Sequence, residues 1–105
     1  MATSTADVAI ILQQMAEYAK TSLEGEPSYI TQSIDGSLFT VVDVSHTDAN
    51  HHADLSLAVR LLPDFVIIEH DINSKPLVNA LVQAGIPREK IILAYAGEVV
   101  PEPVS

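Results

Sequence analysis

The chain contains no cysteine and no tryptophan among its 105 residues. Without cysteine it has no disulfide framework, no thiolate nucleophile and no cysteine-based zinc site. This composition favours a cytoplasmic protein, because disulfides are rare in that compartment. The length is typical of one domain spanning residues 1–105, and the 48% of hydrophobic residues predicts a packed core. We expect residues 1–6 and 98–105 to be flexible.

Long apolar runs are also lacking. The longest, from Ile91 to Ala96, is far shorter than the ~18 residues that a membrane span needs. The first 25 residues do not resemble a signal peptide, because they lack a basic start and carry Asp7 and Glu17 among their apolar residues. We therefore expect no membrane anchor.

Basic residues are scarce. Five lysines and arginines stand against 14 acidic residues, which gives a net charge of −9. Residues 1–54 hold eight acidic residues and one basic residue, a net charge of −7. A DNA-binding surface typically neutralises ~6–10 phosphates with lysine and arginine. We therefore predict no direct nucleic-acid binding, and the acidic N-terminal half favours a cationic partner surface.

Hydrophobic spacing predicts two helices. From Asp7 to Leu23 apolar residues recur at the intervals of one helix face, and Gly25 and Pro27 end this pattern. A second helix is expected to begin near Ser74, with Pro76 in its first turn. Gly85 fits the left-handed position after this helix, where it would let Ile86 fold back onto Leu81.

Alternating and dense apolar runs predict the strands. We expect them at residues 29–34, 38–44, 55–61, 65–68 and 91–95. Asp35-Gly36 is typical of a two-residue hairpin turn between the first two. The predicted fold is α+β, in the order α-β-β-β-β-α-β. It consists of one mostly antiparallel sheet with two helices packed on it.

Catalytic motifs are lacking too. No serine stands in a Gly-x-Ser-x-Gly elbow, and the four glycines are too isolated to form a phosphate-binding loop. Neighbouring acids such as Glu69 and Asp71 are expected by chance in so acidic a chain. Asp43, in the middle of a predicted strand, is the best candidate for hydrolytic chemistry. We predict that the protein is not an enzyme and holds no cofactor.

Histidines offer the alternative interpretation. His46, Asp48, His51 and His52 lie within seven residues, in a polar stretch from Ser45 to Asp54 that reads as a loop. Such side chains can bind zinc or another divalent metal. Their spacing matches no established ligand motif, so solvated loop residues are the preferred interpretation. A metal-binding or small-ligand domain that uses the His46–His52 loop remains the alternative.

One segment carries a family resemblance. The stretch from Leu81 to Tyr95, with Gly85-Ile86-Pro87 at its centre, resembles the corresponding stretch of the XisI-like family, the fdxN element excision controlling factors of cyanobacteria. Pro27-Ser28-Tyr29 is similar to the family's joint between its first helix and first strand. The chain departs from the family where Val44-Ser45-His46 replaces Val-Gly-Trp and where the tail lacks a basic residue. It is identified as a divergent member, with Tyr29, Gly85, Ile86 and Pro87 as structural motif residues.

The resemblance implies a function that composition does not. Family members are accessory factors that control site-specific excision of a DNA element, and they are usually encoded beside a XisH-like protein that resembles a nuclease. The net charge of −9 then favours a regulatory protein that contacts this XisH-like partner rather than DNA. A homodimer is a further expectation, because a small sheet leaves strand edges to cover. The sequence does not indicate which edge.

Overall fold

The computed structural model describes residues 5–20, 27–46 and 51–101. The α+β class and the predicted order of elements are confirmed. The regular elements are α1 (Thr5–Lys20), β1 (Ser28–Gln32), β2 (Leu38–His46), β3 (His51–Leu61), β4 (Val66–Asp71), α2 (Leu77–Gln83) and β5 (Ile91–Leu93). Two single 3₁₀ turns, η1 (Arg88–Lys90) and η2 (Ala94–Ala96), flank β5. Leu23 and the terminal residues 1–4 and 102–105 lie outside the described residues.

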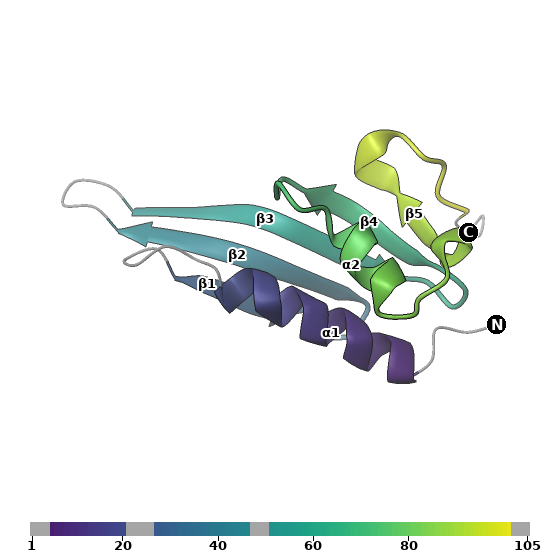
Figure 1. Cartoon of the computed structure of the whole chain (residues 1–105). Helices are drawn as coiled ribbons and strands as arrows, with labels where there is room; N and C mark the ends of the chain where they lie inside the picture. The colour runs from purple at the N-terminus through teal and green to yellow at the C-terminus, as the bar shows by residue number, and fades with distance from the viewer. Residues whose placement is uncertain (1–4, 21–26, 47–50, 102–105) are drawn as a thin grey trace.

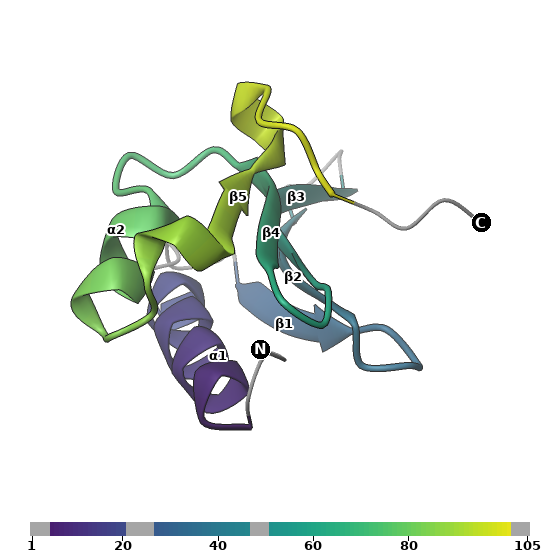
Figure 2. The same ribbon diagram turned by 90° about the vertical axis from the view of Figure 1, so that its right-hand side faces the viewer.

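The five strands form one sheet in the order β1-β2-β3-β4-β5 (Figure 1). Strands β1 to β4 are antiparallel neighbours, whereas β5 runs parallel to β4 because α2 carries the chain back across the sheet. Both helices cover the same face of the sheet (Figure 2). No helix in the part of the chain that the structure describes is long and apolar enough to cross a membrane.

The hydrophobic core lies between the helices and the sheet. Alternate residues of the strands point to this side, since successive side chains of a strand face opposite ways. The buried core residues are Ile11, Met15, Phe39, Val41, Leu57, Val59, Val66, Ile68, Leu77, Val78, Leu81, Ile86 and Ile91. On the other face, Ala58, Ile67 and Ile92 are also buried, so the helix-free side is covered near β4 and β5.

The predicted loop from Ser45 to Asp54 is wrong at both of its ends, and its middle, residues 47–50, lies outside the described residues. Strand β2 continues to His46 and β3 begins at His51, with Val44 opposite Ala53 and Ser45 opposite His52. The side chains of residues 51–55 are exposed, and the paired strands extend beyond α1 (Figure 1). In this segment the two strands are held together by backbone hydrogen bonds rather than by burial of one face. The sequence therefore lacks the alternation of apolar and polar residues that predicts a strand.

The hairpin between β1 and β2 is longer than the predicted two-residue turn. The Gly36 N–H donates to the Ser33 carbonyl at 3.0 Å, so the turn is centred on Ile34 and Asp35. Gly36 follows in the left-handed region, with φ 76°. The hydroxyls of Ser33 and Ser37 both donate hydrogen bonds to the Asp35 carboxylate. These bonds, the one from Ser33 most strongly, lower the pKa of Asp35 to about 2.

The end of α2 confirms the predicted left-handed exit. Gly85 has φ 112°, and its N–H donates to the Val82 carbonyl at 3.1 Å. The Ile86 N–H donates to the Leu81 carbonyl at 3.0 Å, and the buried Ile86 side chain joins the core that contains Leu81. These two bonds satisfy carbonyls that the helix end would otherwise leave unpaired.

Candidate interaction surface

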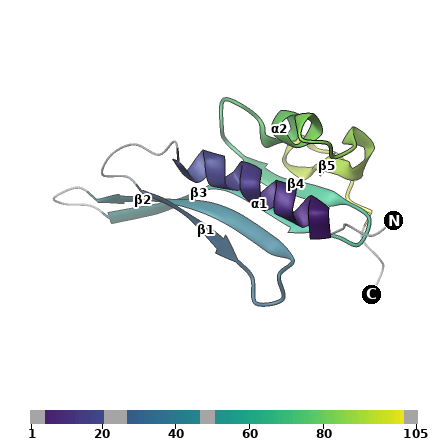
Figure 3. The same cartoon turned by 60° about the horizontal axis from the view of Figure 1, so that its bottom comes forward.

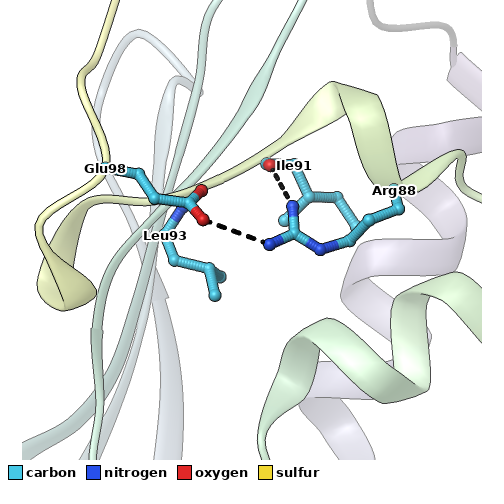
Figure 4. Close-up of polar contacts among 4 residues, drawn as sticks. All are labelled: Arg88, Ile91, Leu93 and Glu98. Carbon is cyan, nitrogen blue, oxygen red and sulfur yellow. Dashed lines mark hydrogen bonds and ion pairs between the residues drawn. The ribbon is translucent and has the colours of Figure 1, made fainter.

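The two edges of the sheet differ in how their backbone groups are satisfied. At β5, Arg88 donates from Nη1 to the Ile91 carbonyl at 2.7 Å (Figure 4). The Leu93 N–H donates to Glu98 Oε1 at 2.8 Å, and the Glu98 N–H donates to the Leu93 carbonyl at 3.1 Å. Arg88 Nη2 lies 3.2 Å from Glu98 Oε2, which links these two side chains.

These bonds close the β5 edge. In a parallel pair, alternate residues direct both backbone groups to the neighbouring strand. Ile91 and Leu93 therefore point their N–H and carbonyl groups away from β4. The remaining outward group, the Ile91 N–H, donates to the Arg88 carbonyl. All four outward groups of β5 thus have partners within the chain.

A glycine and a carboxylate make this closure work. Gly97 has φ 93°, which turns the chain after η2 back toward Leu93. Positive φ values of this kind favour glycine, because the Cβ of any other residue would approach its own backbone. The Leu93 N–H, with a smaller contribution from Arg88, lowers the pKa of Glu98 below its ordinary value. Glu98 is therefore ionised at neutral pH, the state in which it accepts these bonds.

The β1 edge is open in the described part of the chain. The Ser33 N–H donates to the Leu38 carbonyl, and the Val44 N–H donates to the Pro27 carbonyl, both at 2.8 Å. Because hydrogen-bonded pairs alternate in an antiparallel ladder, the backbone groups of Ser28, Ile30 and Gln32 face outward. Among the described residues no strand flanks β1 on that side (Figure 3).

The side chains of β1 are uncharged and largely exposed. Tyr29 is 53% exposed and Ile30 is 37% exposed. Natural edge strands are commonly protected by charged residues, proline or bulges, and β1 has none of these between Ser28 and Gln32. A strand of this kind is a ready template for pairing with another chain.

Carboxylates gather beside this edge. Asp43 lies opposite Ser28 on one side and opposite Asp54 on the other, so the three side chains share one face of the sheet. The Ser28 hydroxyl donates to the half-buried Asp43 carboxylate, while Asp54 is exposed. Like charges placed opposite each other on neighbouring strands repel. A cationic group brought to this row would relieve that repulsion.

The predicted metal candidates are only partly placed by the structure. His51 and His52 are consecutive residues of β3 rather than loop residues, so their side chains point to opposite faces. Asp48 lies outside the described residues, and His46 is the last residue of β2. Within the described ranges no group of three histidine or acidic side chains could hold a metal ion. Metal binding by His46, Asp48, His51 and His52 stays the alternative interpretation, and the structure does not test it.

The acidic residues Glu69 and Asp71 of β4 have different hydrogen-bond partners. Glu69 Oε2 accepts a bond from Arg60 Nε at 2.6 Å. Asp71 instead accepts bonds from the Asn73 N–H at 2.9 Å and from the Leu77 N–H at 2.8 Å. Each carboxylate therefore holds a neighbouring part of the chain in place.

The motif residues have distinct surroundings. Tyr29 is exposed on β1 opposite Val42, whereas Gly85 and Ile86 form the end of α2. Pro87 precedes η1 with φ −58°, the angle that its ring favours. Sequence reasoning did not identify Arg88 and Glu98 as a pair. The signal was weak, because an Arg and a Glu ten residues apart meet only after η2 and Gly97 reverse the chain.

A groove of about 820 Å³ lies between α1 and the start of α2. Its lining includes Glu17, Tyr18, Lys75, Asn79 and Gln83. The Tyr18 hydroxyl donates to the Lys75 carbonyl, and burial raises the pKa of this phenol. The bond ties α1 to the segment that leads into α2, so Tyr18 already has a structural role.

Comparison with known proteins identifies the family. The model of the XisI protein family matches residues 1–102. A XisI-like protein from Anabaena variabilis ATCC 29413 has a structure with TM-score 0.69 and 14% identity, covering 84% of this chain and 82% of that one. The fdxN element excision controlling factor XisI from the same organism gives TM-score 0.58 and 15% identity, covering 87% and 86%. No curated protein matches the chain. At these identities the structures show the fold, and the family match shows that this chain belongs to the XisI family.

Proposed function

We propose that this protein is a non-enzymatic, cytoplasmic accessory factor related to the control of DNA-element excision. The observation that carries the proposal is the XisI family match over residues 1–102. One structure with the same fold is that of the fdxN element excision controlling factor XisI from Anabaena variabilis. The factor acts by binding a XisH-like protein that resembles a nuclease.

The charge distribution supports a protein partner rather than DNA. The chain carries a net charge of −9, and residues 1–54 contribute −7 of it. Phosphates would be repelled by this surface, whereas a basic DNA-handling protein would be attracted to it. Asp71 and Glu98 hold backbone groups in place, so these two carboxylates have structural roles.

The test is a binding measurement with a XisH-like protein. The two purified proteins are run alone and mixed by size-exclusion chromatography with light scattering. We expect a complex of defined stoichiometry that weakens as salt is raised. An unrelated acidic protein of similar size serves as the control. Separate elution of two folded proteins at low salt would contradict the proposed function.

A further inference from the structure

We propose that the open edge of β1 is the docking site for an extended, cationic segment of the partner protein, which adds a sixth strand to the sheet. This inference rests on the proposed function and assigns it a surface. The two edges of the sheet differ: the four outward groups of β5 are bonded within the chain, whereas those of β1 have no hydrogen-bond partner among residues 5–20, 27–46 and 51–101. Within the part of the chain that the structure describes, β1 can therefore accept a strand without first losing bonds of its own, whereas β5 cannot.

The backbone of β1 supplies the affinity of such a contact. Ser28, Ile30 and Gln32 present three N–H groups and three carbonyls outward, at the spacing that an added strand requires. The exposed side chains of Tyr29 and Ile30 lie on opposite faces of β1 and offer apolar contacts to both faces of the incoming strand. An edge of five residues is long enough for a short linear segment.

The charge around β1 selects the kind of segment. No lysine or arginine occurs from residue 21 to residue 59, whereas six acidic residues do. A second copy of this chain would bring another net charge of −9 to this region, so the charge favours a cationic partner over self-pairing. Electrostatic complementarity of this kind speeds association and excludes acidic competitors.

The register of β1 places the cation. A residue opposite Ser28 on an added strand would point to the same face as Asp43 and Asp54. Because neighbouring strands are ~4.8 Å apart, Asp43 lies roughly 10 Å from that position. Ser28 is small, so a lysine or arginine at that position can extend past it toward the Asp43 carboxylate. We therefore expect a lysine or arginine at the position of the added strand that lies opposite Ser28.

The experiment compares Gln32→Pro with Gln32→Ala. Proline removes the outward N–H of residue 32 and leaves the bonds between β1 and β2 intact, because those use Thr31 and Ser33. Alanine removes the same side chain but keeps the N–H. Affinity for the XisH-like protein is measured for both variants, for wild type and for Asp43→Asn. Circular dichroism and thermal melting establish that each variant is folded.

We expect wild type and Gln32→Ala to bind equally and Gln32→Pro to bind at least tenfold more weakly. Asp43→Asn should weaken binding severalfold and reduce its dependence on salt. Hydrogen exchange on wild-type protein should show slower exchange at Ile30 and Gln32 when the partner is present, a readout that needs no variant. Equal binding by all variants with unchanged exchange would overturn the docking site and leave the proposed function intact.

Two other outcomes also count against the inference. If wild type does not bind the folded XisH-like protein at all, the proposed function fails and this inference fails with it. If wild type alone is a dimer by light scattering and Gln32→Pro is a monomer, a second copy occupies the β1 edge. The cationic partner segment would then be the wrong occupant.

Discussion

At the scale of single residues, Asp71 shows how one side chain joins two elements. It ends β4, yet its Oδ2 accepts the N–H of Leu77, the first residue of α2, at 2.8 Å. Its Oδ1 accepts both the N–H and the side-chain amide of Asn73 at 2.9 Å. Pro76, at the N-cap position, has no side chain that could do this. Asp71 therefore replaces the missing cap from a distance of six residues.

We expect Asp71→Ala to destabilise the protein by about 1–2 kcal/mol, the usual cost of losing a helix cap. The fully buried Leu77 makes its N–H hard to satisfy by water. Urea unfolding measures the change as a lower midpoint. Glu89→Ala, on the exposed turn η1, is the control and should stay within about 0.5 kcal/mol of wild type. Equal midpoints for both variants would contradict the capping role.

At the scale of elements, the β5 edge is built from short pieces that are weak individually. The edge consists of a strand of three residues, a 3₁₀ turn and a glycine in the left-handed region. The path of the chain through these short elements is therefore fixed by few residues. The strand ends at Leu93 rather than at the predicted Tyr95, because Ala94–Ala96 turn the chain toward Glu98. Of the four outward groups of this edge, the Leu93 N–H is the one bonded by the carboxylate of Glu98.

The Leu93 amide proton is expected to report the ionisation of Glu98. The pKa of Glu98 is lowered in the folded protein, so ionisation favours the closed edge. Its contribution to stability is complete above the ordinary glutamate pKa and is lost as the pH falls through the lowered value. An NMR titration should therefore move the Leu93 amide signal with a midpoint below the ordinary value. In Glu98→Gln this step should vanish; a step that persists there would assign the titration to another group.

At the scale of the whole molecule, charge decides what the surface can approach. The net charge of −9 is concentrated in the half of the sequence that forms α1, β1 and β2. The basic residues Arg60 and Arg88 are paired with Glu69 and Glu98. The charges of these two arginines are therefore balanced by acidic partners within the chain, although both lie in its less acidic half.

We expect the isolated protein not to bind a labelled DNA duplex in fluorescence anisotropy at 50 mM salt. Binding through phosphates releases counterions, so genuine DNA contact would be strong at low salt and would fall steeply as salt increases. The XisH-like protein is measured in the same buffer as the comparison. Saturable, salt-dependent binding by this chain alone would reverse the view that it acts through a protein partner.

Much of the fold could be predicted because its signals are local. The periodic apolar residues of α1 indicate a helix face, and Gly85 followed by Ile86 indicates where α2 ends. The order of elements follows from such patterns, and the charge count led to the expectation of a cationic partner. The family resemblance around Gly85-Ile86-Pro87 could be identified from the amino-acid sequence without a structure.

The contrast between the edges could not be predicted, because it depends on groups that meet only after folding. Arg88 and Glu98 are ten residues apart, and their roles depend on which backbone groups of β5 face away from β4. The extension of β2 and β3 through Ser45 and His52 leaves no apolar pattern, since backbone bonds alone form it.

The fold class, the order of the elements, the family and the acidic charge could all be predicted from the amino-acid sequence. Each of these follows from neighbouring residues or from a sum over all of them. Three features became visible in the folded chain alone: the closed edge of β5, the edge of β1 that is open in the described chain, and the pairing of Asp43 with Asp54. Strand order and register set these features, because pairing joins residues that are distant in the sequence.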